Sequence, residues 1–110
     1  MQLPLQITFR DMEPSEAIST AIRQKAEKLE AFHEHITSCH VVIETPHKHQ
    51  HKGRIHHVKL HVMLPGREIN IDRDPERGDH EDVHVSIRDA FDAAVRQVKD
   101  HVSRQASHHR

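Results

Sequence analysis

The sequence predicts a two-layer α+β sandwich with the element order β-α-β-β-β-α, in which two parallel helices pack on one face of a four-stranded mixed sheet. Four segments alternate apolar and polar residues, and two longer segments repeat apolar residues at helical spacing. A strand-helix-strand unit favours a parallel pair with a right-handed crossover, whereas the two later connections favour antiparallel pairs. Both helices therefore have to cover one sheet face, and the other face is expected to stay open.

The first strand and the first helix begin the chain. Residues 5–10, LQITFR, place Leu5, Ile7 and Phe9 on one side of a strand. Pro14 follows at a position that a first helical turn tolerates. The helix is expected to end near residues 33–35, and Lys25 is expected to mark the edge of its apolar stripe. The members of that stripe are Ile18, Ala21, Ile22, Lys25, Leu29 and Phe32.

Three further strands follow. Residues 39–44 predict a strand whose inward side chains are Cys39, Val41 and Ile43. Residues 57–64 alternate again, with the inward side chains Val58, Leu60, Val62 and Leu64. Pro65-Gly66 predicts a tight turn, because proline presets one backbone dihedral and glycine accepts a positive one. Residues 67–72 close this hairpin with Ile69 and Ile71 inward.

A charged connector, residues 73–82, leads to the second helix, and either Asp79 or Asp82 can cap its start. The helix is expected to end near Val102. Its apolar stripe consists of Val83, Ile87, Ala90, Phe91, Ala94, Val98 and Val102. Residues 1–104 are expected to form a single domain, and residues 105–110 a disordered tail.

Composition limits the classes of protein that the chain can represent. With 110 residues and neither Trp nor Tyr, it fits one domain whose core is built mainly from aliphatic side chains. The single cysteine, Cys39, excludes an internal disulfide and a Cys-x-x-Cys zinc site. No apolar run approaches the roughly 20 residues of a membrane span, and the N-terminus lacks the features of a secretory signal. We expect a cytoplasmic protein without a membrane partner.

Residues 47–57, HKHQHKGRIHH, suggest metal binding, since an extended chain would place His47, His49 and His51 on one side. However, a structural zinc site usually has four ligands, and a catalytic site has three that are held rigidly. No apolar residue lies between Pro46 and Arg54, so this stretch is typical of a solvated loop, and no cofactor is expected. A metal- or pH-responsive interaction module using residues 47–57 stays an alternative.

Catalytic motifs are missing from the sequence. It contains no nucleophile elbow, no phosphate-binding glycine loop and no Cys-His pair at a recognisable spacing. Cys39 falls on the apolar side of a strand, which is typical of a small buried side chain. Asp72-Arg73-Asp74 is more typical of a turn than of an acid/base pair. The sequence therefore predicts neither an enzyme nor a small-molecule substrate.

Basic side chains on both helices suggest nucleic-acid binding. The candidates are Arg23, Lys25, Lys28, Arg88, Arg96 and Lys99. If the helices pack side by side, these groups can converge into a strip that follows a phosphate backbone. Acidic residues are interleaved on the same helices, so an ordinary helix surface of mixed charge stays an alternative. No aromatic side chain is available on the sheet for base stacking, so phosphate and shape contacts would have to suffice.

Residues 80–98, HEDVHVSIRDAFDAAVRQV, resemble the signature of the ribosome hibernation-promoting factor and ribosome-associated inhibitor family, which includes sigma factor modulation proteins. The matching positions are Glu81, Asp82, Val83, His84, Ser86, Ile87, Arg96 and Gln97. LQITFRDMEPSEAI resembles the family's opening strand and helix entry, and KLEAF followed by HVVIE resembles its helix end and second strand. The resemblance covers about residues 5–102.

The resemblance implies the same fold and a non-catalytic translation regulator that binds the small ribosomal subunit. Family members occupy the channel used by mRNA and tRNA and silence ribosomes under stress, with basic helix residues set against rRNA phosphates. By position, Lys25, Lys28 and Arg96 match basic sites of the family, and Lys99 is their neighbour. Two family basic positions are Ala93 and Asp100 here, and the signature tyrosine is His84. Because each phosphate contact contributes to affinity, the two lost cations are expected to weaken ribosome binding.

Overall fold

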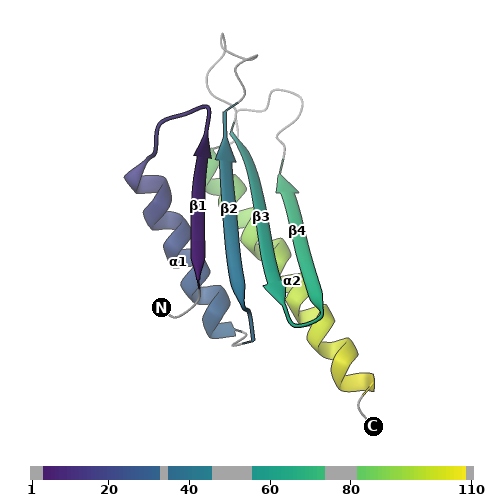
Figure 1. Ribbon diagram of the computed structural model, residues 1–110. Coiled ribbons are helices and arrows are strands. Elements are labelled where there is room, and N and C mark those ends of the chain that lie inside the picture. Colours follow the sequence, from purple (N-terminus) through teal and green to yellow (C-terminus); the bar gives the residue numbers. More distant parts are fainter. Residues whose placement is uncertain (1–3, 33–34, 46–55, 74–81, 109–110) are drawn as a thin grey trace.

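The computed structural model describes residues 4–32, 35–45, 56–73 and 82–108 (Figure 1). Along the chain, the elements are β1 (Leu5–Arg10), α1 (Glu16–Phe32), β2 (Ser38–Glu44), β3 (His57–Leu64), β4 (Arg67–Arg73) and α2 (Val83–His108). This order confirms the predicted β-α-β-β-β-α arrangement and the α+β fold class. The strands and helices begin and end within a few residues of the predicted positions, except at the end of α2.

The strands form one mixed sheet in the order β1-β2-β3-β4. β1 pairs with β2 in parallel, and the pairs β2–β3 and β3–β4 are antiparallel. The β3–β4 hairpin turns through Pro65 and Gly66, since Leu64 is the register partner of Arg67. Gly66 has a φ of 77°, a left-handed conformation that glycine adopts without steric cost. The predicted turn chemistry is therefore the one that closes the hairpin.

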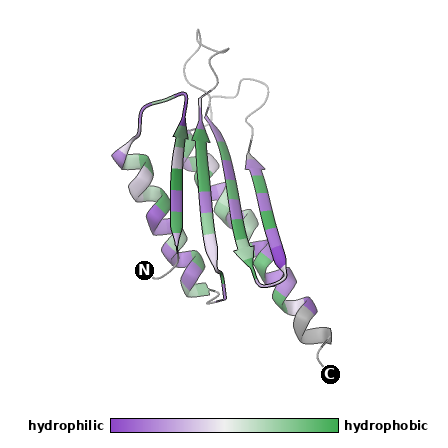
Figure 2. Ribbon diagram, viewed as in Figure 1, coloured by the Kyte–Doolittle hydropathy of each residue, from purple (hydrophilic) through white to green (hydrophobic). Residues whose placement is uncertain are grey.

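Both helices lie on the same face of the sheet and run in the same direction, and no described helix covers the other face (Figure 1). The core fills the space between these layers, and apolar and polar residues alternate along the strands (Figure 2). Every inward strand residue predicted for β2, β3 and β4 is buried. The helices contribute Ile18, Ile22, Ala26, Leu29, Ile87, Ala90, Phe91, Ala94 and Val98.

Local hydrogen bonds fix the start of each helix. The backbone N–H of Ile18 donates to the Ser15 hydroxyl over 3.2 Å, so Ser15 caps α1. The backbone N–H of His84 donates to Asp82 Oδ1 over 2.9 Å. Asp82 is therefore the residue that caps α2, as one of the two predicted alternatives. Its carboxylate also lies at the positive end of the helix dipole, where it stabilises the helix.

Two predicted members of the apolar stripes do not belong to the core. Phe32 is 45% exposed and Val102 is 40% exposed. Phe32 is the last residue of α1 and lies at the edge of the stripe, on the same side as Lys25. Val102 lies five residues past Gln97, which contacts Arg67, the first residue of β4. α2 continues to His108, beyond the strand ends (Figure 1), and so extends into the segment expected as a tail.

Leu60 and Val102 provide a test of this core assignment. Leu60 is 2% exposed in an inner strand, so Leu60→Ala should lower the free energy of unfolding by about 2–5 kcal/mol, because it leaves a cavity. Val102→Ala should lower it by less than about 1 kcal/mol, because this side chain is far more exposed. Urea denaturation measures both losses, and equal losses would contradict the assignment.

Cys39 provides a second test. Burial raises the pKa of its thiol from 9.0 to about 12, so the thiol stays protonated at neutral pH. The thiol ionises more readily in the unfolded chain than in the folded one. The folded state therefore keeps its full stability below about pH 9 and loses stability as the pH rises from about 9 toward 12. At about pH 8, a thiol reagent should label the native protein only at the rate of unfolding, and urea should accelerate the labelling. Rapid labelling without urea would mean that Cys39 is not buried.

Candidate nucleic-acid interface

One flank of α1 carries Lys25, Lys28 and Phe32, which follow one another at intervals of three and four residues. Residues at these intervals lie above one another on a helix surface. The Lys99 ammonium of α2 lies over the Phe32 ring, with its Nζ 5.8 Å from the ring centroid. This contact shows that the flank of α1 with the two lysines faces α2.

The facing flank of α2 follows from the same contact. Residues that precede Lys99 by four, seven and eleven positions share its side of the helix, and these are Val95, Asp92 and Arg88. Arg96 is exposed three residues before Lys99 and lies at the outer edge of this flank. The helices run in the same direction (Figure 1), and their facing flanks meet where Lys99 lies over Phe32. We call the side chains Lys25, Lys28, Phe32, Arg88, Arg96 and Lys99 the inter-helix strip.

Arg23 does not belong to this strip. It precedes Lys25 by two residues, which corresponds to about 200° around a helix, so it lies on the opposite flank of α1. Five of the six predicted RNA-binding residues therefore share the strip, and Arg23 does not. The sequence does not separate Arg23 from Lys25 unless the side of α1 that faces α2 is known.

The positive charge of the strip is partly offset. Arg88 donates from Nε and Nη2 to Asp89 Oδ1, at 3.3 and 3.1 Å. Asp92 lies on the same flank between Arg88 and Arg96. An exposed ion pair of this kind contributes at most about 1 kcal/mol, so a phosphate can replace the carboxylate as the partner of Arg88. The three lysines are the cations on which phosphate binding would depend most.

The signature residues of α2 mainly hold the helix in place. Asp82 caps it, Ile87 is 1% exposed in the core, and Gln97 accepts a hydrogen bond of 3.4 Å from Arg67 Nη2 on β4. The Arg67 Nε is buried, and no described residue accepts a hydrogen bond from it. Gln97 therefore connects α2 to the sheet on the side away from α1. His84 is exposed, and Glu81 lies outside the described residues.

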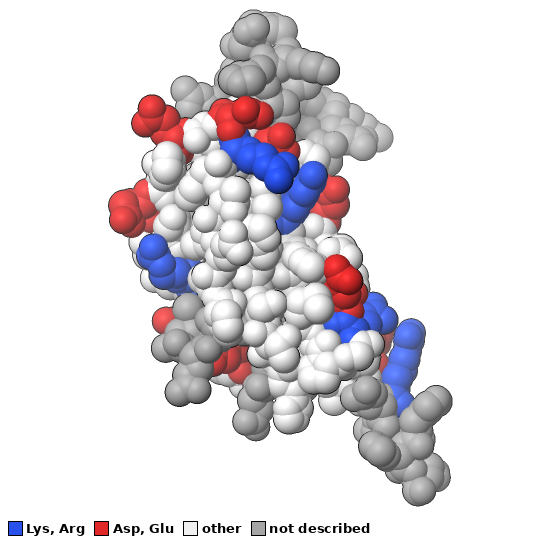
Figure 3. Space-filling view, viewed as in Figure 1, with Lys and Arg blue, Asp and Glu red and all other residues white. Residues whose placement is uncertain are grey.

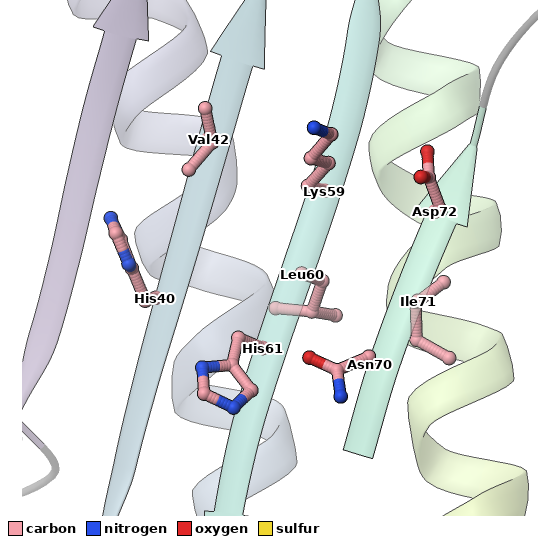
Figure 4. A pocket seen from close by; sticks show the side chains of 8 residues that line it. All are labelled: His40, Val42, Lys59, Leu60, His61, Asn70, Ile71 and Asp72. Carbon is pink, nitrogen blue, oxygen red and sulfur yellow. The ribbon is translucent and has the colours of Figure 1, made fainter. Parts of the chain in front are cut away.

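The open face of the sheet carries imidazole side chains with polar partners. His57 Nε2 lies 2.5 Å from Asp72 Oδ1, and His61 Nε2 lies 2.5 Å from Glu68 Oε2. His40 Nε2 lies 2.9 Å from the Thr8 hydroxyl. Residues of β2, β3 and β4 line a shallow depression of about 300 Å³ (Figure 4), although the side chains of Leu60 and Ile71 point into the core. The lining residues are His40, Val42, Lys59, Leu60, His61, Asn70, Ile71 and Asp72.

Each Lys and Arg described on this face has a carboxylate opposite it. Arg10 is the register partner of Glu44, and Lys59 is the partner of Asp72. The middle of the face shows neither Lys nor Arg, and neither Asp nor Glu, and the charged groups lie nearer its margins (Figure 3). Because each of these cations has a carboxylate on the neighbouring strand, the open face suits a phosphate backbone less well than the inter-helix strip does.

Metal and membrane sites receive no support from the described part of the chain. Within residues 4–32, 35–45, 56–73 and 82–108, no three His, Cys, Asp or Glu side chains are grouped to hold a metal ion. His47, His49 and His51 lie outside these ranges, so the alternative that uses the His-rich segment depends on the sequence alone. Neither described helix has the length and apolar character that crossing a bilayer requires.

Solved structures of other proteins share this fold. A ribosomal subunit interface protein from Coxiella burnetii superposes with a TM-score of 0.74 at 16% identity, covering 92% of this chain and 99% of that one. The Protein Y N-terminal domain from Thermus thermophilus superposes with a TM-score of 0.69 at 20% identity, covering 90% and 98%. At such identities the likeness shows the fold alone.

The family is identified by comparing the sequence with family models. No curated protein matches the chain. A family model described as Sigma 54 modulation protein / S30EA ribosomal protein matches residues 5–106, nearly all of the 110 residues. This match agrees with the resemblance of the α2 signature and of the two N-terminal segments. The chain therefore belongs to the Sigma 54 modulation protein / S30EA ribosomal protein family.

Proposed function

We propose that the chain is a non-catalytic translation regulator that binds the small ribosomal subunit and silences ribosomes under stress. Its binding surface is the inter-helix strip, and its target is the rRNA phosphates beside the channel used by mRNA and tRNA. The observation that carries this proposal is that a chain of this family places Lys25, Lys28 and Lys99 along one helix–helix seam. One structural relative bears the name of a ribosomal subunit interface protein, which supports the choice of partner.

The strip suits phosphates for physical reasons. A lysine ammonium is a compact charge with three donors, so it can meet phosphate oxygens from several directions. Neutralising RNA phosphates releases condensed counterions, which makes such binding strong at low salt and weak at high salt. Parallel helices arrange the cations in an elongated surface rather than a round patch, as a nucleic-acid backbone requires.

Silencing in this proposal needs no chemistry. A folded domain in the channel excludes mRNA and tRNA by occupying their space. The burial of Cys39 fits this view, because its protonated thiol is not a nucleophile. The protein acts where ribosomes are, in the cytoplasm. Ala93 is neutral and packs against the core, and Asp100 is acidic and exposed. Neither residue supplies the positive charge that the family resemblance implies at its position.

Two single substitutions test the strip on one helix. Lys28→Glu and Arg23→Glu make the same change of charge, but only Lys28 faces α2. Lys28→Glu should weaken co-sedimentation with purified small subunits. It should also make the negative slope of log affinity against log salt shallower by about 0.7–0.9, the contribution of one phosphate contact. Arg23→Glu should leave that slope nearly unchanged. Equal effects of the two substitutions would show that the inter-helix strip is not the binding surface.

A triple variant measures the whole surface. Lys25→Glu, Lys28→Glu and Arg96→Glu together should abolish co-sedimentation at moderate salt, because each adds repulsion to the loss of a phosphate contact. Circular dichroism should show an unchanged fold, since Lys28 and Arg96 are exposed and Lys25 is half-buried. If the unmodified protein does not sediment with the subunit even at low salt, the proposed function is wrong.

A further inference from the structure

Phe32 keeps its ring exposed at the end of α1, at the edge of the apolar stripe. The chain has three phenylalanines. Phe91 lies in the core and is 4% exposed, and Phe9 is partly buried and packs against the core. Phe32 is 45% exposed, and within the described residues Val102 is the other large apolar side chain with comparable exposure. Phe32 also lies inside the inter-helix strip. An aromatic ring kept in solvent between cations is a feature of surfaces that bind nucleobases.

Cations bracket the Phe32 ring from both helices. Lys28 precedes it by four residues, so it lies one turn earlier on the same flank of α1. Lys99 approaches from α2, with Nζ 5.8 Å from the ring centroid. A cation–π contact between exposed groups is weak, so the ammonium can leave the ring for a phosphate without great cost. The ring is then free to receive a planar partner.

We infer that Phe32 stacks on an unpaired nucleobase, and that Lys28 and Lys99 bind the phosphates on either side of that base. The inference deepens the proposed function and rests on it, because it names the kind of RNA that the strip recognises. A double helix keeps its bases stacked on one another, whereas a loop, bulge or single strand can offer one to an aromatic side chain. Stacking is also tolerant of base identity, since every base has a π face.

Charge and area favour RNA over a protein at this position. Among the described residues, two large apolar side chains are exposed, which is far less than the core of a stable protein interface. A second copy of the chain would oppose lysines to lysines. An RNA strand instead complements the lysines with its phosphates and the ring with its base, so it uses each of these groups.

Four proteins test the inference: the unmodified chain and the variants Phe32→Trp, Phe32→Leu and Phe32→Ala. Each is titrated with a single-stranded RNA of about 12 nucleotides, with a duplex of the same length, and with purified small subunits. Stacking predicts that the affinity for single strands and for subunits falls in the order Trp or Phe, then Leu, then Ala. The loss on Phe32→Ala should be about 5- to 100-fold for the single strand and negligible for the duplex.

Other outcomes overturn the inference. Equal affinities of the four proteins would mean that Phe32 does not contact RNA. A Leu variant that binds as well as the unmodified chain would indicate an apolar contact without stacking. If Phe32→Ala binds subunits more weakly but binds the single strand as before, Phe32 contacts a ribosomal protein rather than an unpaired base.

Controls separate this inference from the proposed function. Val102→Ala removes the other exposed apolar side chain and should leave RNA affinity unchanged. Thermal melts should show that the Phe32 variants fold, because the residue is exposed at the end of α1. If Lys28→Glu weakens subunit binding while Phe32→Ala does not, the inference fails and the proposed function stands. If no protein binds subunits at low salt, the proposed function fails first.

Discussion

The structure depends on the burial of a single face of its sheet. Only one side of the strands is apolar, so both helices have to pack there. They are parallel because each follows a strand, β1 or β4, and these two strands run in the same direction. Small side chains at the helix–sheet contacts, such as Ala26, Ala90 and Ala94, are fully buried and allow close approach. Two parallel helices on one face necessarily share a seam. The candidate interface is that seam, and it exists because the core has only one side.

The sequence predicts the fold well because periodicity is a local property. Alternation identifies the four strands, and the helical stripes identify α1 and α2. Side-chain chemistry also predicts Asp82 as a cap and Pro65-Gly66 as a turn. The end of α2 is less predictable, since the helix continues beyond its last sheet contact, where apolar spacing no longer specifies it. Val102 fits the stripe in sequence, yet its side chain is 40% exposed.

The candidate site is less predictable for a different reason. Arg23 and Lys25 are two residues apart in sequence, yet they lie on opposite flanks of α1, and only the direction of α2 decides which flank matters. Phe32 looks like a core residue by spacing, and its exposure appears only when the helices are placed. The family signature gives limited help, because Arg96 alone of its described residues belongs to the strip, whereas Asp82, Ile87 and Gln97 secure α2. The signature therefore identifies the fold more directly than the contact surface.

The paired charges of the open sheet face have a consequence for the number of RNA molecules that one protein can bind. A protein that binds RNA through its helices turns this face outward, where Arg10 and Lys59 each have a carboxylate opposite them on the neighbouring strand. Such a face attracts no second RNA strand, so one molecule cannot bridge two RNAs electrostatically. Under the proposed function, the protein therefore has one RNA-binding side, formed by its helices, and the described part of its sheet face is not expected to recruit a second RNA.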